Sequence, residues 1–143
     1  MTTIESRFNV GAKGSLTKTI TERVVKDFAE MTGDVQPLHL DPSYGAQTRF
    51  GRQVAHGVIS VGLISAVLGV VMAGPDVTVI FLGLNIKFIA PVFPGESVTA
   101  ECVVTHVRED KPIVTLEAKC TKEDGSEVLA GEVTIMVDPF PRK

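Results

Sequence analysis

The longest apolar stretch of the chain runs from residue 57 to residue 74 and carries no charged side chain over 18 positions. That length reaches the lower limit for a membrane-spanning helix. The stretch also contains four glycines and two serines, and it lacks flanking basic and aromatic anchors. A helix that is apolar on every side can equally lie at the centre of a protein. We therefore predict a buried central helix and no membrane partner.

The chain after this helix has the pattern of β-strands. Residues 97–107 alternate, with Val98, Ala100, Cys102 and Val104 on one face. Further strands are predicted over 77–89, 113–121 and 127–137, and the turns between them are rich in proline, glycine or charged residues. Strands joined in this way form an antiparallel meander.

A short strand and a helix precede the apolar stretch. Residues 14–20 have the pattern of a strand, and Thr21 is a plausible N-cap for a helix that places Val24, Val25, Phe28 and Met31 on one face. The predicted order is strand, helix, loop, long helix and four strands. A curled antiparallel sheet around one long helix is the hot-dog architecture of the α+β class. We expect residues 1–143 to form a single domain of this kind.

Composition narrows the possible partners and the cellular compartment. The formal net charge is -3 and the pI is about 5.6, and the basic residues form no stripe, so nucleic acid is not an expected partner. Cys102 and Cys120 lie in apolar surroundings and are predicted to be buried thiols. The N-terminus does not have the pattern of a signal peptide, which favours the cytoplasm.

The densest group of acid–base side chains lies between the two predicted helices. Asp34 and His39 are five residues apart, and Pro37 between them stiffens the loop, so that both could contact one water molecule. Gly33 followed by Asp34 can also be an ordinary helix stop. His56 and Gly57 open the apolar stretch, where the unpaired N–H groups of a helix start favour an anion.

The same segments resemble a known family, the MaoC-like, R-specific enoyl-CoA hydratases, including the short members that supply polyhydroxyalkanoate synthesis. The resemblance covers essentially the whole chain. Its most specific part is Phe28-Ala29-x-x-Thr32-Gly33-Asp34-x-Gln36-Pro37-x-His39-x-Asp41, continued by Phe50-Gly51 and Ala55-His56-Gly57. Further matches are Phe88-x-x-Pro91-Val92-x-x-Gly95-Glu96 and residues 108–112. The family usually has Asn where this chain has Gln36, which leaves substrate preference open.

The resemblance implies a reaction and a set of site residues. Asp34 and His39 would jointly orient and deprotonate a water molecule that adds to a trans-2-enoyl-CoA, giving the (R)-3-hydroxyacyl-CoA. The backbone N–H of Gly57 would bind the thioester oxygen. Ser65 would hydrogen-bond the catalytic carboxylate, although a bond to its own helix carbonyl is an equal alternative. Neither a metal nor a cofactor is expected.

The resemblance also implies a homodimer with an acyl pocket near the interface, lined by Leu68. An exposed sheet edge and an uncovered flank of the central helix favour such a dimer independently, because soluble proteins normally cover both.

Other polar residues of the segment have simpler interpretations. We expect His56 to fix the entry to the central helix, His106 to be a solvated strand residue, and Asp41 before Pro42 to be a turn former or cap. Three basic residues could meet coenzyme A phosphates, although a solvated position is the expected one for each: Arg49, Arg52 and Lys87.

Two other functions stay open at this point. A hot-dog thioesterase would use a carboxylate and the same helix-end site to hydrolyse the thioester. A non-catalytic acyl-thioester binding subunit would be indicated by loss of Asp34 or His39, and both are present. The signature around Asp34 favours hydration.

Overall fold

The computed structural model describes residues 4–142. The helices are α1 (Ile4–Arg7), α2 (Glu22–Thr32), α3 (Pro37–Leu40), α4 (Pro42–Ala46) and α5 (Val58–Ala66), which continues as the π-helical segment η1 (Val67–Met72). The strands are β1 (Lys13–Thr19), β2 (Val77–Phe88), β3 (Ser97–Val107), β4 (Ile113–Lys122) and β5 (Glu127–Pro139).

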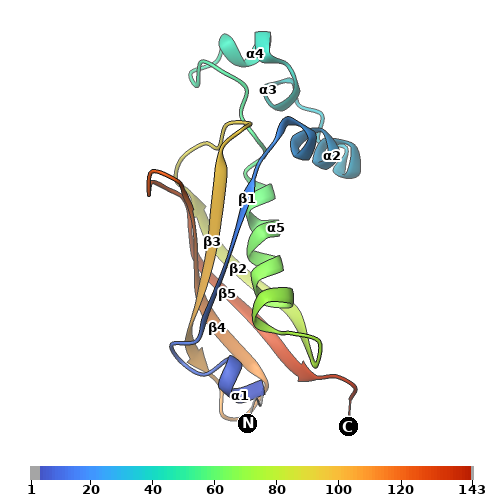
Figure 1. Ribbon diagram of the computed structural model, residues 1–143, viewed down its shortest axis with the longest axis vertical. Coiled ribbons are helices and arrows are strands. Elements are labelled where there is room, and N and C mark those ends of the chain that lie inside the picture. The colour runs from blue at the N-terminus through green and yellow to red at the C-terminus, as the bar shows by residue number, and fades with distance from the viewer. Residues whose placement is uncertain (1–3, 143) are drawn as a thin grey trace.

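The five strands form one antiparallel sheet in the order β1-β3-β4-β5-β2. The helix α5 runs along one face of this sheet, and α2, α3 and α4 gather at the end of the molecule where α5 begins (Figure 1). Both termini lie at the opposite end (Figure 1). The predicted antiparallel sheet and central helix are confirmed. The sheet is open, with β1 and β2 as its edges.

The core lies between α5 and the sheet. Val98, Ala100, Cys102 and Val104 of β3 are buried, as their alternation predicts. The side of the central helix that faces the sheet is also buried, because Ile64, Val67 and Leu68 are 0% exposed. These side chains recur at three- and four-residue spacing, so they form one stripe of the helix against the sheet.

Helix α2 has the predicted start and end. The Thr21 side chain accepts a hydrogen bond from the backbone N–H of Val24 at 3.1 Å. Gly33 ends the helix with a φ of 81°, the left-handed conformation that a glycine adopts without strain. Met31 is 76% exposed, so its predicted place on the buried face is wrong. It lies two residues, about 200°, around the helix from the buried Ala29.

The central helix is shorter than the predicted range. Regular α-helical geometry ends at Ala66, and η1 ends at Met72. Arg7 closes this end, since its guanidinium donates to the carbonyl of Ala73 at 2.7 Å and pairs with the Asp76 carboxylate. That guanidinium lowers the pKa of Asp76. No helix of the described residues 4–142 has both the length and the apolar character needed to cross a membrane.

Candidate active site

His39 lies on the short helix α3, where the sequence predicted a loop. Pro37 occupies the first turn of α3, where its missing N–H costs nothing. His39 is 9% exposed, and its Nδ1 lies 2.6 Å from the carbonyl oxygen of Val54. A carbonyl oxygen can only accept, so Nδ1 carries a hydrogen, and in the neutral ring Nε2 is then the nitrogen with the lone pair. His39 is therefore presented as a hydrogen-bond acceptor or base through Nε2.

The segment beside α3 fixes this helix from a second side. The backbone N–H of Val54 donates to the carbonyl of Leu38 at 3.2 Å, and the buried Gln53 side chain donates to the carbonyl of His39. Ala55 is in turn bonded to the carbonyl of Val92 at 2.8 Å. The base is thus anchored to the turn between β2 and β3. Such restraint keeps a catalytic side chain in one geometry.

Asp34 follows the end of α2 and its side chain is exposed. The Thr32 hydroxyl donates to the carbonyl of Phe28 at 2.7 Å and accepts from the backbone N–H of Asp34 at 3.2 Å, which shapes this turn. A carboxylate oxygen of Asp34 and one ring nitrogen each of His39 and His56 lie within 4.8 Å of one another. The structure therefore brings together Asp34, from the turn after α2, and His39, from α3.

His56 is more deeply buried than His39 and Asp34. It is 3% exposed, and its Nε2 lies 2.9 Å from the backbone oxygen of Asp34. Its ring stacks on that of His39 with centroids 3.8 Å apart and planes 30° from parallel. The expected structural role at the entry to α5 agrees with this position. The contact with both acid–base residues is information that the sequence did not supply.

The three groups gathered here are the ones that could hold a metal ion in the described part of the chain. The stacked arrangement of the two imidazoles suits such an ion poorly. Two ligands of a tetrahedral zinc ion converge on it from directions roughly 109° apart, which separates their rings by more than 3.8 Å. The geometry fits acid–base chemistry on a bound water better.

Gly57 lies where the segment turns into α5, with helical φ and ψ of -57° and -33°. No acceptor for its backbone N–H lies among residues 4–142, as expected for the first turn of a helix. A Cβ at this position would approach ring carbons of Phe88 to 2.9 Å, so the glycine allows the ring to lie directly against the backbone. The free amide and the helix dipole favour negative charge at this point.

A cavity of about 460 Å³ adjoins His39 and Gly57. It is largely apolar, and β2 and the turn after it form one wall. The lining includes Phe50 and Phe88, which belong to the motifs quoted above, and also Val58, Ser60 and Ile89, which the sequence did not single out. Ser60 is buried and lies three residues beyond Gly57, so helical spacing could have revealed it.

Two predicted pocket residues lie elsewhere in this single chain. Ser65 is exposed, and no hydrogen bond joins it to Asp34 among the described residues. Leu68 is fully buried in the core. Neither lines the 460 Å³ cavity. Their proposed contacts with substrate therefore stay predictions.

The remaining polar residues behave mostly as expected. Asp41 caps α4, accepting from the backbone N–H groups of Ser43 at 2.9 Å and Tyr44 at 3.2 Å. His106 is an exposed residue of β3. Arg49 and Arg52 are exposed and do not line this cavity, and the Arg52 guanidinium lies 4.4 Å from the centre of the Phe93 ring.

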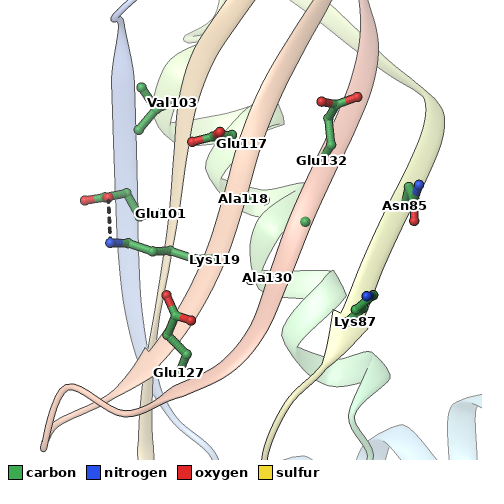
Figure 2. A pocket seen from close by; sticks show the side chains of 11 residues that line it. Asn85, Lys87, Glu101, Val103, Glu117, Ala118, Lys119, Glu127, Ala130 and Glu132 are labelled. Atoms are coloured by element: carbon green, nitrogen blue, oxygen red, sulfur yellow. Dashed lines mark ion pairs between the residues drawn. The ribbon is translucent and has the colours of Figure 1, made fainter.

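A larger hollow, about 550 Å³, lies on the opposite face of the sheet. Figure 2 shows its charged side chains in front of the strands, with α5 behind them. Glu117 and Glu132 face each other across β4 and β5, and Lys119 pairs with Glu101 at 3.9 Å. Lys87 belongs to this hollow and not to the cavity beside His39. It contains no histidine, so we place the site at the smaller, apolar cavity.

The two cysteines are not suited to act as nucleophiles. Burial raises the pKa of Cys102 to about 12 and that of Cys120 to about 11. Because the thiolate is the reactive form, both remain protonated thiols at neutral pH. Both are free, and the predicted buried thiols are confirmed.

Fold and site together define a hot-dog protein with an acid–base pair beside a free helix-start amide. The MaoC like domain family matches residues 6–125, and the chain belongs to this family. The match spans α2, the segment of Asp34 and His39, the central helix and most of the sheet.

Individual relatives are similar over most of their length. The chain is 40% identical to an (R)-specific enoyl-CoA hydratase of Aeromonas caviae over 126 residues, which covers 88% of this chain and 92% of the relative. It is 41% identical to an (R)-specific enoyl-CoA hydratase of Rhodospirillum rubrum, covering 89% and 86%. A solved R-hydratase of Pseudomonas aeruginosa superimposes with a TM-score of 0.83 at 36% identity, covering 94% and 83%.

Proposed function

We propose that this protein is an R-specific enoyl-CoA hydratase, a hydro-lyase that reversibly adds water to trans-2-enoyl-CoA and forms (R)-3-hydroxyacyl-CoA. The observation that carries the proposal is that the Asp34 carboxylate and the His39 ring lie together, close to the unpartnered amide of Gly57, while Nδ1 of His39 is bonded to the Val54 carbonyl. Membership of the MaoC-like family and the similarity to (R)-specific hydratases support the same reaction.

In this proposal Asp34 and His39 hold one water molecule between them. The carboxylate and Nε2 are both acceptors, so the two hydrogens of the water can point at them while its lone pair faces the β-carbon. As the new C–O bond forms, one proton of that water leaves and is returned to the α-carbon on the same face. The addition is therefore syn, and the site ends each turnover in its starting protonation state.

The charge that develops during addition falls on the thioester oxygen. The N–H of Gly57 is free to bind this oxygen, and the positive end of α5 stabilises the enolate-like state. The reaction so described uses water, two side chains and one amide, and it requires no cofactor.

The apolar cavity provides room for the acyl chain. Phe50, Val58, Phe88 and Ile89 line it beside His39, and burial of methylene groups against them favours an apolar tail. We retain Leu68 and Ser65 of the central helix as further substrate-side residues, with Ser65 facing the Asp34 carboxylate once the assembly is complete.

We further propose that the protein is a homodimer. Strand β2 is an uncovered sheet edge, and the neighbouring side of α5 and η1 carries small or apolar residues that are exposed in the single chain. A second copy would cover both surfaces and close the open side of the cavity. The exposed residues that this contact would bury include Val58, Gly62, Ser65, Ile80, Leu84 and Phe88.

The compartment proposed is the cytoplasm, since both cysteines are free buried thiols that need no oxidising surroundings.

The test is an absorbance assay at the enoyl-thioester band with crotonyl-CoA and longer enoyl-CoA substrates, followed by chiral analysis of the product. We expect loss of the band without release of free coenzyme A, and an R product. Release of the free thiol would assign a thioesterase instead. An S product would contradict the proposed stereochemistry.

A further inference from the structure

The deeply buried His56 contacts every part of the proposed machinery. Its Nε2 lies 2.9 Å from the backbone oxygen of Asp34, and its ring stacks on His39 at 3.8 Å. On another side the ring of Phe28 lies 4.7 Å away at 51°. The next residue is Gly57, whose amide is the proposed oxyanion donor.

The hydrogen bond to Asp34 fixes the tautomer of His56. Because the backbone oxygen of Asp34 can only accept, Nε2 is the nitrogen that carries hydrogen. The Nδ1 atom is buried and has no partner among the described residues. A buried acceptor left unpaired costs free energy, so this ring is not placed to satisfy its own hydrogen bonds. This placement instead fixes the positions of Asp34 and His39.

The turn that carries Asp34 has few other restraints. The residue is exposed, and its backbone is otherwise held by the 3.2 Å bond to the Thr32 hydroxyl. The His56 bond crosses 22 positions of sequence and ties this turn to the start of α5. It therefore sets the distance between the carboxylate on one element and the Gly57 amide on another.

We propose that His56 is a positioning residue for the hydration step, a role that rests on the proposed function. Its Nε2–H holds the Asp34 turn. Its ring, packed against that of His39, restricts rotation of the His39 side chain. Positive charge that develops on His39 during proton transfer lies over the face of the His56 ring, which favours it as a cation–π contact does. His56 itself exchanges no proton with the substrate.

Two substitutions separate these contributions. His56→Gln keeps an N–H donor near the Nε2 position and removes the ring, whereas His56→Phe keeps a ring and removes the donor. We expect each to lower kcat by about 10- to 100-fold with KM changed by less than about threefold, because a shift of about 1 Å in a catalytic group can cost 10²-fold. His106→Gln, at an exposed strand position, is the matched control and should keep the wild-type kcat.

A residue that only stabilises the fold would not give this pattern. If His56 acts through Asp34, adding either substitution to Asp34→Asn should lower kcat by less than about threefold more, since coupled groups are not additive. Independent, multiplicative losses, or single variants within about twofold of wild type, would overturn the proposal.

A measurement on the unaltered protein covers the case in which the variants do not fold. The ¹⁵N chemical shifts of the His56 ring in the wild-type protein should show the tautomer with hydrogen on Nε2 and an unprotonated Nδ1. The opposite tautomer would refute the bond to Asp34 and the inference with it. The two proposals fail separately, because absence of hydration by the wild-type protein would remove the proposed function whatever the tautomer of His56.

Discussion

The Nδ1 of His39 and the carbonyl oxygen of Val54 are 2.6 Å apart, and this hydrogen bond leaves Nε2 as the free nitrogen of the imidazole. Val54 belongs to the segment that also leads to His56 and Gly57. One short stretch therefore orients the base, supports the Asp34 turn and presents the helix-start amide. The order of these residues along the chain explains how three functional groups from separate elements are fixed relative to one another.

The acid–base pair gives the first prediction. Asp34→Asn and His39→Gln should each lower kcat by at least about 10²-fold, the scale of a positioned acid or base. Both residues act on one water, so the double variant should be much less than multiplicative. The assay is the loss of enoyl-thioester absorbance, with circular dichroism to confirm folding. Near-normal turnover in either single variant would return that residue to a structural role.

Gly57 gives the second prediction. Gly57→Ala should lower kcat/KM by about 10-fold or more, because the new methyl group meets the Phe88 ring at 2.9 Å and displaces the amide or the ring. The Phe88 side chain is 55% exposed and can move aside, so the fold should survive. Combining Gly57→Ala with Phe88→Ala tests whether the clash with the Phe88 ring causes the loss of activity. If the clash with this ring is responsible, the second substitution restores part of the activity, and if the substrate needs the space, it does not.

Assembly gives the third prediction. Sedimentation should show a particle of twice the 15.3 kDa chain mass, and Leu84→Lys on the exposed edge strand should yield monomers. Val10→Lys, at an exposed apolar residue outside the sheet, is the control and should leave the dimer intact. A wild-type monomer at assay concentration would remove the proposed dimer.

Leu68 gives the fourth prediction. Leu68→Phe should shift the preferred substrate toward shorter acyl chains while crotonyl-CoA is still hydrated. The side chain is fully buried, so the larger ring should also cost about 1–3 kcal/mol of unfolding free energy. Rates with a series of enoyl-CoA chain lengths give the first effect, and denaturant unfolding gives the second. Leu68→Met, which conserves volume, is the control, and an unchanged chain-length profile in Leu68→Phe would exclude this residue from the acyl pocket.

Asp41 gives the fifth prediction. Its carboxylate accepts two backbone N–H bonds at the start of α4, so Asp41→Ala should lower the free energy of unfolding by about 1 kcal/mol. Asp41→Asn keeps an acceptor and should cost less. Turnover should be nearly unchanged in both, as expected for a cap. A fall of about 10²-fold in kcat would instead identify Asp41 as a second catalytic acid.

The sequence by itself determined the five strands, helix α2 and the central helix, together with their order, but not the short helices α1, α3 and α4. Alternation in residues 97–107 fixed the buried face of β3, because side chains on a strand alternate between two faces. Local chemistry determined helix ends in the same way. Thr21 caps the start of α2 and Gly33 ends it, and both the side-chain cap and the left-handed glycine act within a few residues. Asp34 and His39 could be singled out because their residue types and spacing are visible in one dimension.

The tertiary structure decided which distant groups meet. The tautomer of His39 depends on Val54, the packing of Gly57 depends on Phe88, and the place of His56 depends on the backbone of Asp34. The burial of α2 is likewise centred on Val25 and Ala29, and Met31 at the end of this helix is exposed although helical periodicity predicted it on the apolar face. Local patterns report which side of an element is apolar. Contacts between elements depend on how all of them pack at once, and that information belongs to the folded chain.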